Sequence, residues 1–253
     1  MSSFGDKIAP NGIEWCPFRQ AFVYQDKQFI RGLTPILKRV FYPLFEYNRA
    51  NHGLTTGVTV NASGGRHKGL VKGIKIDEEI THIINVERQV SQSKCHPTTW
   101  RFFSSLRERG LRPIKAQVVV GSKEINVATR MDVLCMDNDS KTPGYVVLEL
   151  KTGYLHYYDR HTGNTMPAPL EVLPDSPYNQ HQLQVGMTRW LFEKTYPRSQ
   201  VKNAFVVVLS SDGRVVWIKE MDLIRRHISS IVELIRVKKP KQRGRGRGRG
   251  RSK

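Results

Sequence analysis

Hydrophobic residues recur along this chain with two different periods, and each period predicts a type of element. Where apolar residues return every three or four positions, as at Ile76, Ile80 and Ile83, the spacing is typical of a helix that packs one face on a core. Proline near the start and glycine after the end also mark helix boundaries. On these grounds helices are expected at 29–47, interrupted at Pro35 and Pro43, and at 76–90, 97–110, 179–196 and 221–237.

Shorter segments alternate or are rich in β-branched residues, which predicts strands. The expected strands are 114–120, 125–136, 145–151, 204–209 and 214–218. The first two flank the turn sequence GSKE and the third follows a turn rich in Asp, Asn, Pro and Gly, so these three predict an antiparallel meander. The chain up to Lys27 is expected to be an irregular lead-in, and the Gly- and Thr-rich segment 51–69 a loop. The expected fold class is α/β (α+β), with a mixed central sheet flanked by helices.

The segment 128–153 contains the residues that point most directly to chemistry. Asp132 lies within an apolar strand, where an acid is costly to bury without a partner. Glu149 and Lys151 are two positions apart in the next strand, so their side chains share one face, and a hairpin places Asp132 beside Glu149. Two carboxylates and one ammonium group suit a hard cation such as Mg²⁺ and a water molecule to be activated. The alternative is a structural ion pair between Glu149 and Lys151 at the end of a strand.

Charge restricts the class of partner. The 253 residues include 41 Lys and Arg against 22 Asp and Glu, a net charge of +19. Ten of the basic residues and no acid lie from Arg236 onward, so the preceding part, with 31 basic and 22 acidic residues, still has a net charge of +9. Such a surplus favours a polyanion, with nucleic acid as the first candidate and a membrane surface as the second.

Cysteine usage and the N-terminus indicate the compartment. Cys16, Cys95 and Cys135 have no metal-ligand spacing, which argues against a structural zinc site or an iron–sulfur cluster and is typical of a reducing environment. The first residues have neither the apolar core of a signal peptide nor the arginine-rich pattern of a transit peptide, and no apolar run reaches the length of a membrane span. The expectation is a soluble intracellular protein that is not secreted and has no membrane partner.

Four short motifs follow one another on an expected helix, two strands and a second helix. They are Gly73-x-x-x-Asp77, Thr129-Arg130-Met131-Asp132, Glu149-Leu150-Lys151 and Gln182-Leu183-Gln184. Their order and placement resemble the PD-(D/E)xK nuclease superfamily, in particular its phage lambda exonuclease and RecB-like branch. The resemblance covers 73–209 and implies a restriction-endonuclease-like core. The chain departs from the pattern at Met131, which replaces the signature proline, and in the long interval between Asp132 and Glu149.

The resemblance implies a metal-dependent nuclease that hydrolyses phosphodiester bonds in DNA. It implies that Asp132, Glu149 and the backbone carbonyl of Leu150 hold Mg²⁺ or Mn²⁺. Lys151 is then the catalytic residue that positions or activates the attacking water.

Two helical residues complete the implied site. Gln182 is the catalytic glutamine that braces it, with Gln184 as the alternate. Asp77 on the upstream helix is the further metal-site acid, and Glu78 is its rival, because the family more often has Glu or His there.

The C-terminal tail is a low-complexity segment that has no means of forming a core. It resembles arginine–glycine nucleic-acid binding tails, in which flexible guanidinium groups contact phosphates or a narrow minor groove. The expected DNA contacts are Arg243, Arg245, Arg247, Arg249 and Arg251. The lysines 238, 239 and 241 also resemble a nuclear localisation signal, and a purely solubilising tail is the alternative.

Three parts are expected: an N-terminal helical or irregular extension over 1–69, a PD-(D/E)xK nuclease-like domain over 70–235, and a disordered basic tail over 236–253. The favoured function is a DNA nuclease of replication, recombination or repair, exonuclease before endonuclease, acting on double-stranded ends or single strands. The resemblance allows a homo-oligomer or a partner recombinase. The alternative is a non-catalytic nucleic-acid-binding protein on a nuclease fold, against which the intact set Asp132, Glu149 and Lys151 argues.

Overall fold

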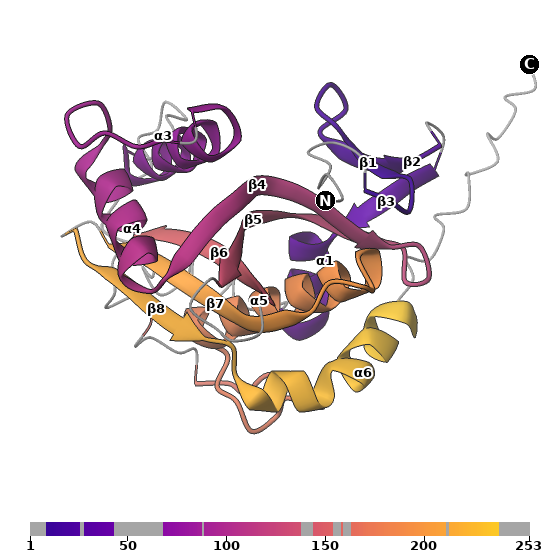
Figure 1. Cartoon of the computed structure of the whole chain (residues 1–253). Helices are drawn as coiled ribbons and strands as arrows, with labels where there is room; N and C mark the ends of the chain where they lie inside the picture. Colours follow the sequence, from indigo (N-terminus) through magenta and orange to yellow (C-terminus); the bar gives the residue numbers. More distant parts are fainter. Residues whose placement is uncertain are drawn as a thin grey trace, which may run out of the picture.

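The chain forms an eight-stranded mixed sheet with helices on both faces (Figure 1). The computed structural model describes residues 9–25, 28–42, 68–87, 89–137, 144–153, 158, 163–210 and 213–237. The expected mixed α/β class is therefore confirmed. The expected loop lies outside these residues except for its last two positions, and the tail from 238 onward lies outside them entirely.

The centre of the sheet is the antiparallel meander that the sequence predicts. It consists of β4 (Leu111–Ser122), β5 (Val127–Asp137) and β6 (Gly144–Gly153), paired in that order. β4 and β6 extend beyond their expected bounds at both ends, whereas β5 begins two residues later and ends one residue later than expected. In the β5–β6 register, Val133 lies opposite Leu148.

Beyond β6 the sheet continues through a parallel and then an antiparallel step. β7 (Val201–Ser210) pairs in parallel with β6, and β8 (Val215–Lys219) pairs antiparallel with β7. Two parallel neighbours need a crossover connection, which contains α5 (Pro177–Thr195). The Ser176 hydroxyl begins this helix by accepting a 3.3 Å hydrogen bond from the Asn179 N–H, and Pro177 occupies a first-turn position whose missing N–H is tolerated.

The N-terminal lead-in is not irregular, which corrects the sequence-based expectation. β1 (Ile13–Cys16) and β2 (Ala21–Tyr24) form a hairpin, and β3 (Gln28–Gly32) joins it to the edge of β5 in a parallel pairing. The following α1 (Leu33–Phe41) contains Pro35 in its first turn, where proline does not interrupt a helix. The N-terminal part of the chain is thereby an extension of the central sheet.

One face of the sheet is covered by α3 (Lys68–His82), its π-helical continuation η1 (Ile83–Glu87) and α4 (Pro97–Glu108). Helix α3 begins eight residues before the expected start at 76, so Asp77 lies in the middle of α3 rather than in its first turn. Glu79 links α3 to α4, because its carboxylate accepts a 3.1 Å hydrogen bond from the His96 N–H, just before α4 begins. The carboxylate thus satisfies a donor at the start of the second helix.

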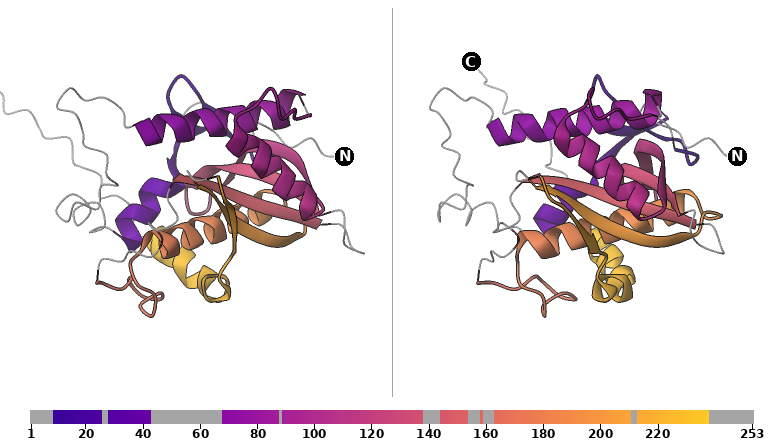
Figure 2. Two further views of the ribbon diagram at one scale, coloured as in Figure 1. Left: turned by 90° about the vertical axis from the view of Figure 1, so that its left-hand side faces the viewer. Right: turned by 60° about the vertical axis from the view of Figure 1, so that its left-hand side comes forward.

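The opposite face is covered by α1, α5 and α6 (Asp222–Val237), so the fold has three layers (Figure 2). Leu37, Phe192 and Ile235 from these helices are fully buried against the strands. Over the described ranges, no helix is both long enough and apolar enough to cross a membrane.

Candidate functional site

The candidate site lies where β5 loses its strand partners on one edge. β3 pairs with the start of β5 at 127–128, and β6 pairs with its end at 133–137. Between these two ladders, the described strands leave 129–132 without a partner on that edge. The Asp132 side chain lies at this gap. Its Oδ2 accepts a 2.7 Å hydrogen bond from the backbone N–H of Leu150, in place of a backbone hydrogen bond between β5 and β6. The continued register places Asp132 opposite Glu149, as the sequence predicts.

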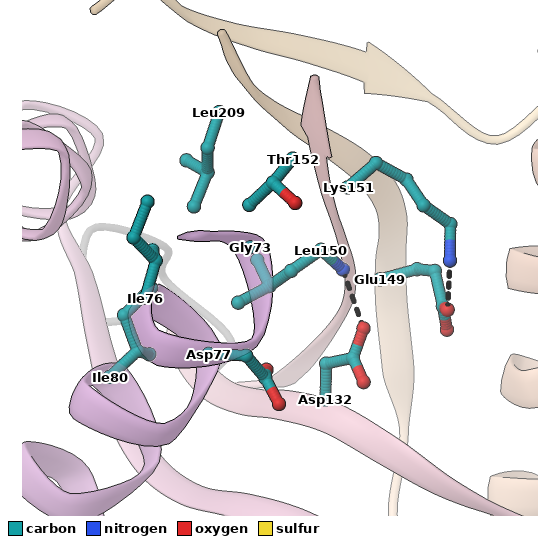
Figure 3. A pocket seen from close by; sticks show the side chains of 10 residues that line it. All are labelled: Gly73, Ile76, Asp77, Ile80, Asp132, Glu149, Leu150, Lys151, Thr152 and Leu209. Atoms are coloured by element: carbon teal, nitrogen blue, oxygen red, sulfur yellow. Dashed lines mark hydrogen bonds and ion pairs between the residues drawn. The ribbon is translucent and has the colours of Figure 1, made fainter. Parts of the chain in front are cut away.

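A pocket of about 200 Å³ opens at this gap (Figure 3). It brings together the three acids and the lysine that the sequence analysis selected, from one helix and two strands. Its lining is Gly73, Ile76, Asp77, Ile80, Asp132, Glu149, Leu150, Lys151, Thr152 and Leu209.

Helix α3 supplies Asp77 and not Glu78. Asp77 lines the pocket, whereas Glu78 is exposed on the helix surface. Gly73, one turn earlier, lets the helix approach the end of β6, since a Cβ at this position would stand 2.2 Å from Oγ1 of Thr152. The spacing Gly73-x-x-x-Asp77 therefore has a packing reason: the glycine permits the contact that places the acid.

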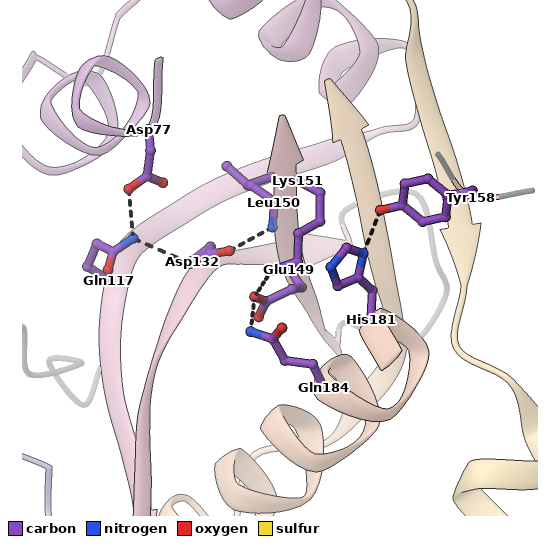
Figure 4. Close-up of polar contacts among 9 residues, drawn as sticks. All are labelled: Asp77, Gln117, Asp132, Glu149, Leu150, Lys151, Tyr158, His181 and Gln184. Carbon is purple, nitrogen blue, oxygen red and sulfur yellow. Dashed lines mark hydrogen bonds and ion pairs between the residues drawn. The ribbon is translucent and has the colours of Figure 1, made fainter. Parts of the chain in front are cut away.

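Glu149 is held on its other side by a lysine and a glutamine (Figure 4). The Lys151 ammonium group lies 2.7 Å from Oε1 of Glu149. The Gln184 side-chain amide donates to the same oxygen. Gln184 is thus the glutamine at the site, and the choice of Gln182 is corrected: the Gln182 Oε1 accepts the Met221 N–H at 2.8 Å and joins α5 to the start of α6.

Burial and mutual repulsion disturb the acids. Burial is the largest effect on Asp132 and, together with the charge of Glu149, it raises the pKa of this carboxyl well above its ordinary value. Burial also raises the pKa of Asp77, which the nearby Arg130 partly opposes. For Lys151, burial acts to lower the pKa, but the carboxylates of Glu149 and Asp132 outweigh it, so the pKa is raised and the ammonium group stays charged.

Three residues at or near the site were given no role by the sequence analysis. His181 lies three positions before Gln184 on α5, and its Nδ1 is 2.8 Å from the Tyr158 hydroxyl (Figure 4). Burial, with a further contribution from Lys151, lowers the pKa of His181 well below its ordinary value, so the imidazole is neutral. Helical spacing from Gln184 was a usable signal for this residue. Arg130 belongs to the motif Thr129-Arg130-Met131-Asp132, which was a usable signal. The Gln117 amide lies 3.5 Å from the carboxylates of Asp77 and Asp132, but nothing in the sequence distinguishes this glutamine from others.

The donor set fits a hard divalent cation. Asp77, Asp132 and Glu149 offer carboxylate oxygens, and the Leu150 carbonyl leaves the strand on the same edge as its N–H, toward Asp132. Among the described residues, no three His, Cys, Asp or Glu side chains stand close enough together to be a ready-made metal cluster. The carboxylates are instead turned to other partners: that of Glu149 contacts Lys151 and Gln184, and those of Asp77 and Asp132 face the Gln117 amide.

Comparison with models of known protein families gives no match for this chain, and comparison with curated proteins gives none either.

The close approach at Gly73 makes a first prediction. Gly73→Ala is expected to lower the free energy of unfolding by about 1–3 kcal/mol, because the added methyl group overpacks the contact with Thr152. Thr152→Ala removes the clashing hydroxyl, so the double variant should recover most of the loss. Chemical unfolding of the four proteins measures this coupling. Equal losses in the single and double variants would contradict the proposed contact.

A second prediction concerns pH. Folding raises the pKa of Asp132, so the folded protein keeps a proton that the unfolded chain releases, and stability is lost as pH rises from the ordinary aspartate pKa to the raised one. Asp132→Asn keeps an oxygen for the Leu150 N–H without the charge. In chelator it should be more stable than wild type, and the advantage should grow as pH rises from about 4, the ordinary range of an aspartate, to the raised pKa, by about 1.4 kcal/mol in total for each unit of pKa shift.

The matched control is Asp137→Asn on the same strand, where the carboxylate lies 3.6 Å from Lys202. This variant loses an ion pair and should not be more stable than wild type at any of these pH values. Chemical unfolding at several pH values compares the three proteins. An Asp132→Asn curve parallel to wild type would show that the carboxyl is not perturbed.

Proposed function

We propose that this protein is a metal-dependent DNA nuclease with a PD-(D/E)xK type active site and a restriction-endonuclease-like core. The observation that carries the proposal is the convergence of Asp77, Asp132, Glu149 and Lys151 at one pocket, with Gln184 behind Glu149. These residues come from four elements spread over more than a hundred positions. A structural ion pair between Glu149 and Lys151 requires neither Asp132 nor Asp77 at the same place.

The cation would be held by Asp132, Glu149, the Leu150 carbonyl and Asp77. When bound, Mg²⁺ or Mn²⁺ supplies a Lewis acid that polarises the phosphate and lowers the pKa of the attacking water. Buried acids with raised pKa values are a natural place for such a charge, because a cation offsets the repulsion between the carboxylates.

The remaining groups position the reaction. The Lys151 ammonium group is charged and fixed at 2.7 Å from Glu149, so it can orient a water molecule or stabilise negative charge on phosphorus oxygens. Gln184 holds Glu149 in one orientation through its amide. Both residues restrict the site to one geometry before substrate arrives.

DNA is the substrate that the charges favour. The net charge is +19 for the whole chain. Beside the acidic pocket, Arg130 is exposed and its guanidinium lies 4.4 Å from the ring centre of Trp15 in β1. Burial raises the pKa of Asp77, and the charge of Arg130 opposes part of this rise, so a cationic group stands next to the acids and can meet an adjacent phosphate. The family resemblance favours exonuclease over endonuclease.

The test is digestion of end-labelled linear duplex, single-stranded and closed circular DNA, each with Mg²⁺ or with chelator. A nuclease releases label only with Mg²⁺, and an exonuclease spares the closed circle. Asp132→Asn should lose at least about a hundredfold in rate, since several kcal/mol of metal assistance disappears. Tight DNA binding without any cleavage in Mg²⁺ or Mn²⁺ would favour a non-catalytic nucleic-acid-binding protein instead.

A third prediction separates the chemical role of Lys151 from DNA binding. Lys151→Ala should lower the single-turnover cleavage rate by about 10²–10³-fold, because a charge aimed at the developing negative charge is lost. Its affinity for DNA in Ca²⁺ should stay within about threefold, since one contact among many is removed. Lys219→Ala, an exposed lysine on β8, controls for the loss of one positive charge. Weak binding with an unchanged cleavage step would make Lys151 a phosphate contact instead.

A fourth prediction concerns the tail, which lies outside the described residues. Deletion of 238–253 should weaken DNA binding at low salt and flatten its salt dependence, because each lost phosphate contact removes about 0.9 from the slope of log K against log salt. Single-turnover cleavage at saturating DNA should be unchanged, since the pocket residues all lie between 73 and 209. Identical salt slopes for full-length and truncated protein would show that the tail does not contact DNA.

A further inference from the structure

Gln117 has a backbone conformation that a strand residue with a side chain rarely adopts. Its φ is +57°, in the left-handed region, although it lies in the middle of β4. The register puts Gln117 opposite Asp132, between the pairs Ala116–Val133 and Val118–Met131. Neither glycine nor asparagine, the residues that tolerate this region best, is present here. Such an outlier, held in place by the fold, points to a function.

Both strands change face at this pair. Ala116 packs with the α3 and α4 layer and Val118 with the α1 and α5 layer, although residues two apart in a regular strand share a face. On β5, Val133 and Met131 are divided between the layers in the same way. β4 and β5 arch in their middle parts in Figure 1. The left-handed residue turns the strand so that the Gln117 side chain points to the acids.

A neighbouring side chain fixes the backbone beside this bend. Asn85 in η1 donates its amide N–H to the Ala116 carbonyl at 3.2 Å and accepts the Ala116 N–H at 3.0 Å. The amide therefore replaces a strand partner for Ala116, the residue just before the bend. The unusual conformation of Gln117 is consequently built into the packing of η1 on β4.

The side chain that this geometry presents is a neutral amide between two carboxylates. Its Nε2 lies 3.5 Å from Oδ2 of Asp77 and 3.5 Å from Oδ1 of Asp132 (Figure 4). An amide carries a carbonyl oxygen next to its NH₂ group, and amide carbonyls are ligands of hard cations. A neutral oxygen adds a ligand without adding to the repulsion among the acids of the pocket.

We propose that Gln117 belongs to the cation site, where its side-chain carbonyl oxygen is an additional ligand and its NH₂ group holds the carboxylates of Asp77 and Asp132. The inference rests on the proposed function, because it names a further residue of the same site. It requires the left-handed backbone, since the side chain of a regular strand residue would not stand between these two acids.

The test is the affinity for Mg²⁺ measured by calorimetric titration of the full chain without DNA. Gln117→Gly keeps the left-handed conformation, because glycine adopts it readily, and removes the whole side chain with its amide. It should weaken Mg²⁺ binding about 10- to 100-fold. Gln117→Glu restores an oxygen donor and should bind at least as tightly as wild type. Gln20→Gly is the matched control, the same change at an exposed residue of φ +48° in the turn between β1 and β2, and should bind like wild type.

The outcomes separate the two proposals. Failure of wild type to bind Mg²⁺ or Mn²⁺ would overturn the proposed function. Wild-type binding with equal affinity in Gln117→Gly would overturn the role of Gln117 alone, and leave the nuclease proposal standing. Weaker binding in Gln117→Glu than in Gln117→Gly would also overturn it, because an oxygen donor at this position would then not assist the cation.

Discussion

The hydrogen bond from the Leu150 N–H to the Asp132 carboxylate is the interaction on which the arrangement of this site depends. The described β5–β6 pairing ends at Leu148, and β6 then continues in pairing with β7. The bond therefore satisfies a backbone donor that this ladder no longer pairs. The same bond fixes the acid at the opening. Without it, the end of β6 would expose an unpaired N–H, and only the strand register would place Asp132 opposite Glu149.

The pocket concentrates like charges in a partly buried place, which opposes folding. The pocket holds three carboxylates, Asp77, Asp132 and Glu149, against one ammonium group, that of Lys151, and burial raises the pKa values of both aspartates. Hydrogen bonds from Gln184 and the Leu150 N–H offset part of this penalty. Packing requirements are stringent as well, since Gly73 leaves no room for a Cβ. Buried like charges and a close packing contact both reduce the stability of the fold. Their concentration at one place is expected where function, and not stability, selects the residues.

The sequence predicted the parts of this fold that follow from local periodicity. The meander, the crossover helix and the acids on neighbouring strands were all found, because alternation and turn residues determine register over short distances. The glutamine was misassigned because α5 is buried around most of its circumference, so its pattern does not indicate which of Gln182 and Gln184 faces β6. β1 and β2 were missed because they are four residues each and their turn resembles a loop. The left-handed backbone at Gln117 follows from the contact of η1 with β4, and nothing in the sequence around Gln117 predicts it.

The gap in the sheet also explains how residues from both layers reach one place. Asp77 comes from α3 on one face, and Gln184 comes from α5 on the other. In a continuous sheet the paired strands would separate them. Here none of the described strands pairs with one edge of β5 at 129–132, and the acids of two adjacent strands lie at the opening. Each layer therefore positions part of the site, and a displacement of either helix layer changes the distances between the acids, the lysine and the glutamine. Coupling of this kind makes the geometry of the pocket depend on the packing of the whole domain rather than on a single loop.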